Sequence, residues 1–178
     1  MVGHWYPSLS IWNDRSISLS PKIRLMSSLV TSIFLYATES WTLKAELQRG
    51  KQAKEMRCYR KILCISCKDH VTNEEVSAKI QQAVERHEHL LTIVKRRKLQ
   101  WYGHVSSSSG LVKIILQGTV KGRRRQGRRR KRWEDNIREW TGLEFAMSQR
   151  AVENRGKWWK LVAKSAVVPQ RPLRLRDR

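Results

Sequence analysis

The chain has 178 residues, 40% of them hydrophobic, which is enough for one domain or two small ones. Its formal net charge is +22, and that charge is uneven: residues 1–90 carry 13 basic and 9 acidic residues, whereas residues 91–178 carry 24 and 6. A field of one sign this strong repels itself unless a polyanion is near. The charge therefore predicts nucleic acid as the main partner, with an anionic membrane surface as the second choice.

Several protein classes are disfavoured by the same inspection. The 3 cysteines fall within residues 58–67, and an odd count with no recognisable leader argues against a disulfide scaffold. The longest apolar run, around 29–37, is far shorter than the roughly 20 residues that span a bilayer. The start, MVGHWYPSLS, lacks the basic and apolar regions of a secretory leader. We expect an intracellular protein, nuclear or cytoplasmic, that is neither secreted nor bound to a membrane.

The first half of the chain predicts helices. Ser20 and Pro21 fit an N-cap followed by proline at the first helical position, and apolar residues over 26–37 then follow a helical period. A second helix is predicted from near Thr42 to Leu63, with one basic face. We therefore expect two helices before the cysteine-containing segment ends.

Further helices are predicted on both sides of residue 90. Thr72 and Glu75 have the spacing of a capping box, which marks the start of a short helix. The next helix is predicted over 88–105 and carries the sequence KRRK in its middle. Residues 106–110, SSSSG, read as a loop, and the apolar segment 111–116 is of ambiguous type.

The C-terminal part begins with a cationic segment that lacks apolar periodicity, over 118–130. Trp133 then starts a helix that ends near Gly142, and a final helix is predicted over 152–162. The residues 141–144, TGLE, suggest another capping box. The spacing of Trp133, Ile137 and Trp140 favours packing in a hairpin core over stacking on bases, and of the adjacent Trp158 and Trp159 only one can face that core.

The predicted fold class is all-α, because no segment shows strand-like alternation. We expect a flexible N-terminus at 1–20, a small helical bundle at 21–105, a basic linker at 106–132, a basic helical hairpin at 133–165 and a disordered tail at 166–178.

Two clusters of basic residues are the predicted nucleic-acid contacts, one in the helix over 88–105 and one before Trp133. Guanidinium groups pair with phosphate oxygens through parallel hydrogen bonds, and each neutralised phosphate releases counterions. An import signal or a solvated segment is the alternative interpretation. The candidate residues are Lys95, Arg96, Arg97, Lys98, Lys121, Arg123, Arg124, Arg125, Arg128, Arg129, Arg130, Lys131 and Arg132.

Other candidate groups predict no chemistry of their own. Cys58, Cys64, Cys67 and His70 form C-x5-C-x2-C-x2-H, but Cys58 and Cys64 on one helix would point about 120° apart. We expect small apolar cysteines and a surface histidine, with a metal site as the open alternative. The pair at 87 and 89, both histidines, has no neighbour placed to complete a triad, and we expect both to face solvent.

Five segments, in this order, resemble the C-terminal region of the reverse transcriptase polyprotein of non-LTR (LINE-type) retrotransposons. They are SLVTSIFLYATESWTL, EMRCYRKIL, DHVTNEEV, LLTIVKRRKLQWYGHV and RRKRWEDNIREWTG, and the similarity runs from about Ile11 to the C-terminus. The resemblance implies a thumb-like helical region followed by a basic segment that holds nucleic acid. The first ten residues do not fit the pattern, which suggests an alternative start, a spliced exon or a degraded copy.

The resemblance does not extend to catalysis. Such polymerases hold two Mg²⁺ ions with a Tyr-x-Asp-Asp turn and a further aspartate. Here the 4 aspartates, at positions 14, 69, 135 and 177, are scattered, and no Asp-Asp pair occurs. We expect no catalytic residues, no cofactor and no metal in this chain.

We therefore expect a nucleic-acid-binding fragment of a retrotransposon reverse transcriptase, which contacts RNA or DNA through phosphates. A palm-bearing reverse transcriptase polypeptide is a further possible partner, and self-association through an exposed apolar face at 29–36 is expected. The alternative is a translated remnant of a decayed element with no selected activity.

Overall fold

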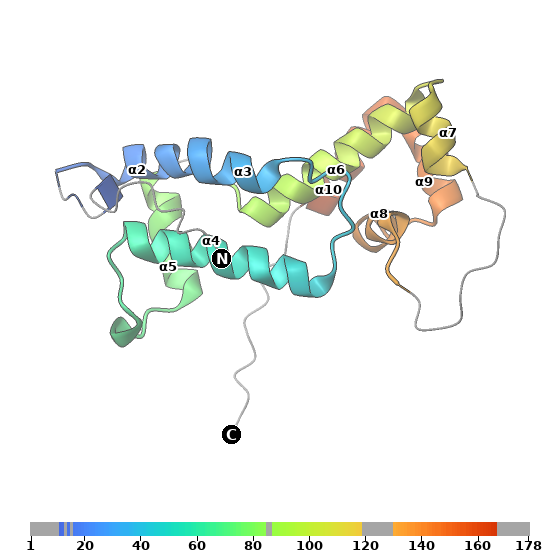
Figure 1. Cartoon of the computed structure of the whole chain (residues 1–178). Helices are drawn as coiled ribbons and strands as arrows, with labels where there is room; N and C mark the ends of the chain where they lie inside the picture. Colours follow the sequence, from blue (N-terminus) through green and yellow to red (C-terminus); the bar gives the residue numbers. More distant parts are fainter. Residues whose placement is uncertain (1–10, 13, 15, 85–86, 119–129, 167–178) are drawn as a thin grey trace. The chain divides into compact units, whose positions relative to one another are not determined.

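The computed structural model describes residues 11–166 except for positions 13, 15, 85–86 and 119–129 (Figure 1). In these residues all regular structure is helical and no strand occurs, which confirms the all-α prediction. Most of the expected flexible start at 1–20 lies outside the described residues. So does nearly all of the expected disordered tail at 166–178. The elements are α2 (Leu19–Met26), η1 (Ser27–Thr31), α3 (Ser32–Leu35), α4 (Ala45–Ile62), η2 (Cys67–Asp69), α5 (Asn73–Ala83), α6 (Leu90–Ser107), α7 (Leu111–Gln117), α8 (Trp133–Thr141), α9 (Phe145–Glu153) and α10 (Arg155–Ala166).

The chain divides into two compact units, and neither is a continuous segment. The first unit comprises residues 1–36 and 45–90, and the second comprises residues 37–44 and 91–178. The sequence predicted a division after residue 105. The structure instead groups most of α6 with the C-terminal helices, because Leu99 and Tyr102 of α6 share a core with Ile137 of α8.

In the first unit, α2, η1 and α3 form one uninterrupted helical run whose middle is a π-helical turn (Figure 1). Ser18 is the N-cap of α2, so Ser20 and Pro21 lie inside the first turn rather than at its start. The run packs with α4 and α5 around a buried apolar core. That core contains Trp12, Ile23, Met26, Tyr59, Ile62, Val76 and Ile80.

The start of α5 forms as the sequence predicted. The Thr72 hydroxyl accepts a hydrogen bond from the Glu75 N–H (3.3 Å), and the Glu75 carboxylate accepts one from the Thr72 N–H (3.1 Å). This capping box satisfies two backbone donors at the helix N-terminus, which lack partners inside the helix.

The second unit packs α6 with α8, α9 and α10 around Leu99, Tyr102, Ile137, Val152, Trp158 and Val162. Gly103 allows the closest contact: a Cβ at this position would lie 2.3 Å from Nε1 of Trp158. The second predicted capping box is wrong. Gly142 ends α8 with a left-handed φ of +71°, and Thr141 donates to the Ile137 carbonyl (2.7 Å) instead of capping α9. Glycine suits this conformation because it has no Cβ.

Exposed apolar residues occur in both units. On the helical run of the first unit, Leu29, Ile33 and Tyr36 are 45%, 54% and 79% exposed, as the sequence predicted for this face. In the second unit, Leu111 and Ile115 are 70% and 71% exposed on α7, a segment of ambiguous type in the sequence. Self-association through the face at 29–36 stays a prediction. Among the described helices, none is long and apolar enough to cross a bilayer.

Candidate nucleic-acid interface

The cationic block at 95–98 does not form one surface. Successive residues on an α-helix point about 100° apart, so four in a row are distributed around the whole helix. Arg97 is exposed, Lys95 and Arg96 are half-buried, and Lys98 is completely buried. Only part of the predicted block is therefore available to a phosphate.

Lys98 is a structural residue of the second unit, and its prediction as a phosphate contact is wrong. Its ammonium donates to the carbonyl of Trp41 (2.6 Å) and to Oδ1 of Asn136 (3.0 Å). The ammonium also lies 4.5 Å from the ring centre of Trp133 and 5.6 Å from that of Trp140. Buried cations occur where acceptors and aromatic faces replace water, and this site supplies both.

Burial lowers the pKa of Lys98 to about 7, and the nearby ammonium of Lys131 acts in the same direction. The two acceptors and the two indole faces favour the charged form and oppose this shift. The charge of Lys98 therefore has a desolvation cost, which these contacts partly compensate.

The same network fixes the segment 37–44 against α8. Asn136 is fully buried, and its side-chain amide accepts from the Leu43 N–H and donates to the Leu43 carbonyl, each at 2.8 Å. Trp133 Nε1 donates to the Glu39 carbonyl (2.7 Å). Three side chains therefore join α8 to the segment 37–44. Trp133 and Asn136 belong to α8, and Lys98 of α6 contacts both the Trp41 carbonyl and Asn136.

Three further cations contact residues of α8, which runs from Trp133 to Thr141. Lys95 lies 5.5 Å from the Trp140 ring centre, and burial lowers its pKa. Lys131 forms an ion pair with Glu139, and Arg132 forms one with Glu134 (2.8 Å). Because partly exposed ion pairs contribute little to stability, these carboxylates can be exchanged for phosphate at small cost.

The densest part of the predicted interface is only partly described. Arg130 is exposed, directly before the Lys131 and Arg132 pairs. The remaining predicted residues, Lys121, Arg123, Arg124, Arg125, Arg128 and Arg129, lie outside the described residues.

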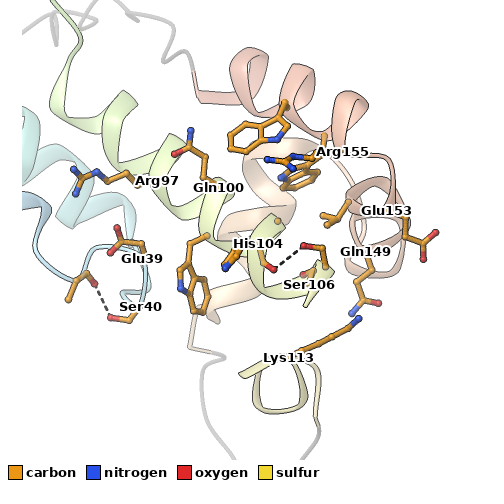
Figure 2. Close-up of a pocket in the computed structure, with 17 residues that line it drawn as sticks. Glu39, Ser40, Arg97, Gln100, His104, Ser106, Lys113, Gln149, Glu153 and Arg155 are labelled. Atoms are coloured by element: carbon orange, nitrogen blue, oxygen red, sulfur yellow. Dashed lines mark hydrogen bonds between the residues drawn. The ribbon is translucent and has the colours of Figure 1, made fainter. Parts of the chain in front are cut away.

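A cavity of about 1310 Å³ opens in the second unit beside α6 (Figure 2). Three cations line it, Arg97 from α6, Lys113 from α7 and Arg155 from α10, together with the acids Glu39 and Glu153. Of these cations only Arg97 was predicted as a contact. The sequence carries no signal for Lys113 and Arg155, because each is a single charge whose position depends on the tertiary fold.

The tryptophans behave largely as the sequence predicted. Trp133 and Trp140 pack against the core around Ile137, as predicted, but that core is formed by α6, α8, α9 and α10 rather than by a two-helix hairpin. Trp158 is 2% exposed and Trp159 is 42% exposed, so only Trp158 faces the core, although both line the cavity. Trp159 is therefore the aromatic side chain of the cavity that is most accessible for stacking on a base.

The histidine prediction is wrong. His87 and His89 are half-buried rather than solvent-facing, and both approach the buried carboxylate of Glu55 on α4. The cysteine predictions hold in part: Cys58 is half-buried and His70 is exposed, but Cys64 is exposed rather than buried. The side chain of Cys67 is not described.

Comparison with protein-family models, with curated proteins and with solved structures found no match for this chain.

Proposed function

We propose that this chain binds RNA or DNA through the phosphates, with little sequence preference, as the C-terminal fragment of a non-LTR retrotransposon reverse transcriptase. The observation that carries the proposal is the charge of residues 91–178, which hold 24 basic and 6 acidic residues. A net charge of +18 on this half attracts a polyanion strongly at physiological salt. The five segments that resemble the retrotransposon family support the same conclusion.

The proposed contacts fall into two groups in the second unit. Arg96 and Arg97 of α6 form one group, and the segment 121–132 that leads into α8 forms the other. Lys98 is excluded from both because its ammonium is buried. Lys95 contributes charge near Trp140 rather than a free hydrogen-bonding group. Contacts of this kind position a duplex or single strand without reading its bases.

No polymerase or nuclease activity is proposed for the chain by itself. It has no Asp-Asp pair, and a two-metal polymerase site needs clustered carboxylates. A palm-bearing polypeptide would have to supply that site. This part of the proposal predicts primer extension only when such a partner is added. It also predicts loss of stimulation when the cations of α6 and of the segment 121–132 are substituted.

The test is fluorescence anisotropy of labelled single-stranded RNA and duplex DNA over a salt series. One variant replaces six arginines of the cationic segment with glutamine: Arg123, Arg124, Arg125, Arg128, Arg129 and Arg130. Each lost phosphate contact lowers the log–log salt slope on duplex DNA by about 0.9, so the slope should fall by up to about 5.

A matched control removes the same amount of charge from the first unit. It replaces six basic residues that are exposed there: Arg24, Arg49, Lys54, Arg57, Lys68 and Lys79. If both variants reduce the slope equally, binding follows total charge and the proposed interface is wrong. If the wild-type protein binds neither nucleic acid in low salt, the alternative of a decayed remnant without selected activity becomes the better account.

A further inference from the structure

The first unit contains a buried carboxylate, that of Glu55. Glu55 is 5% exposed on α4, and its described ion-pair partner is His89, with 3.7 Å between Oε1 and Nδ1. A buried carboxylate is costly unless a cation or several donors compensate its charge. The groups around Glu55 therefore indicate which kind of ligand would compensate its charge.

Three donors already converge on one oxygen of Glu55. Its Oε1 accepts from the Tyr59 hydroxyl (2.8 Å) and from the Leu90 N–H at the start of α6 (2.8 Å), and it faces His89. Oε2 takes none of these three contacts. The carboxylate is thus oriented by its neighbours.

Two imidazoles complete the cluster. His87 Nε2 lies 2.7 Å from the Tyr59 hydroxyl, and the His87 and His89 rings meet edge to face with centres 5.6 Å apart. One ligand atom from each of Glu55, His87 and His89 lies within 4.8 Å of the other two. No other group of three or more His, Cys, Asp or Glu side chains in the described part of the chain converges in this way.

The two histidines are shifted in opposite directions. Burial lowers the pKa of His87, and the neighbouring His89 adds to this, whereas the hydrogen bond to Glu55 raises the pKa of His89, so a metal ion competes with a proton at His89. Burial also raises the pKa of Tyr59, so its hydroxyl stays protonated and acts as a donor to Glu55. Metal-bound carboxylates commonly receive such a hydrogen bond from a neighbouring side chain.

We propose that Glu55, His87 and His89 bind a divalent transition-metal ion, with Zn²⁺ as the best match. Two imidazoles and one carboxylate are a donor set that Zn²⁺ accepts, with a fourth position open to water. The ion would join α4 to the segment that leads into α6. This site is separate from the proposed nucleic-acid interface, so either can fail without the other.

The test uses the full chain without a polyhistidine tag, stripped of metal with a chelator. Zn²⁺ is titrated in competition with a chromophoric chelator, and one equivalent should bind. Glu55→Gln keeps an oxygen that accepts from Tyr59 and Leu90, so the unit should stay folded by circular dichroism. Both Glu55→Gln and His89→Gln should weaken binding at least about 10-fold.

Two controls separate this site from other ligands of the chain. His70→Gln removes an exposed histidine of the same unit and should leave the affinity unchanged. Replacing Cys58, Cys64 and Cys67 with serine tests the cysteine cluster. The proposal is overturned if the wild-type chain binds no Zn²⁺, or if the cysteine variant loses binding while Glu55→Gln retains it.

A further measurement needs no variant. The Co²⁺-loaded wild-type protein should show visible ligand-field bands without the charge-transfer absorption that thiolate ligands produce. Zn²⁺ should also protect His87 and His89 from diethyl pyrocarbonate, mapped by mass spectrometry, while the exposed His70 and His104 still react. Equal modification of all four histidines with and without Zn²⁺ would refute the site.

Discussion

Replacement of Asn136 by alanine should destabilise the second unit more than any other single polar substitution we consider. The side chain is fully buried, and it forms hydrogen bonds with both backbone groups of Leu43 and with the Lys98 ammonium. Alanine removes all of them and adds no donor or acceptor. Water cannot substitute freely at a buried position, so the former partners keep much of their desolvation cost.

The expected magnitude follows from the groups left behind. Each buried partner that loses its hydrogen bond costs about 1–3 kcal/mol, so the total loss in the free energy of unfolding should be about 3 kcal/mol or more. For a domain of this size class, about 1 kcal/mol changes Tm by about 4–8 °C. Asn136→Ala should therefore lower the Tm by at least about 12 °C.

Intrinsic fluorescence is a suitable assay, because 6 of the 8 tryptophans lie in the second unit. Urea and thermal unfolding of the variant would be compared with those of Asn154→Ala. Asn154 accepts from the Lys157 N–H (3.1 Å) at the exposed start of α10, and loss of such a cap costs about 1 kcal/mol. If Asn136→Ala is no more destabilising than Asn154→Ala, the buried network does not hold residues 37–44 to α8 and the reasoning is wrong.

Three further substitutions test other contacts. Gly103→Ala should lower the free energy of unfolding by about 1–3 kcal/mol, because its Cβ would lie 2.3 Å from Trp158 Nε1. This loss should exceed the gain from alanine's better helix propensity. A neutral or stabilising result in urea unfolding would show that the indole moves aside. Lys98 has a pKa of about 7 in the folded state, below its value in the unfolded chain. The unfolded chain therefore binds more protons above pH 7, and the free energy of unfolding should rise from pH 7 to 10. Urea midpoints across this range should rise less steeply for Lys98→Met, and parallel slopes would contradict the assignment. Thr72→Ala should cost about 1 kcal/mol by removing the hydroxyl that accepts from Glu75, measured by circular dichroism, whereas Thr72→Ser should be close to wild type.

Much of the helical structure follows from local sequence signals. The Thr72–Glu75 capping box and the spacing of Trp133, Ile137 and Trp140 each depend on residues within a few positions of one another, and both form as predicted. The TGLE segment shows the limit of such signals. There Gly142 ends one helix, and its left-handed conformation prevents Thr141 from starting the next.

The burial of Lys98 has a local signal in the sequence, which is its position on α6 and not its charge. One face of α6 carries Leu91, Val94, Tyr102 and Val105, at spacings of three, eight and three. Lys98 lies on the same face, four residues from both Val94 and Tyr102. A cation in an otherwise apolar stripe indicates a buried, compensated charge rather than a surface contact. The basic residues at 95–97 mask this pattern in the sequence.

Other features had no local signal. Leu43, a partner of Asn136, lies 93 positions earlier in the chain, and Leu90, a partner of Glu55, lies 35 positions later. Which polar side chains meet depends on the packing of whole helices. The cavity cations Lys113 and Arg155 belong to the same class, since neither is part of a charged run.

The short segment 37–44 has a consequence for how the protein can be cut. It interrupts the first unit in sequence and belongs to the second. The chain therefore passes from one unit to the other after residues 36, 44 and 90. A truncation that begins at residue 91 would keep every helix of the second unit yet remove Trp41 and Leu43, the backbone partners of Lys98 and Asn136. Neither half can be isolated by a single cleavage, and an autonomous version of the C-terminal unit would require residues 37–44 to be supplied as a separate peptide or joined by a new connection.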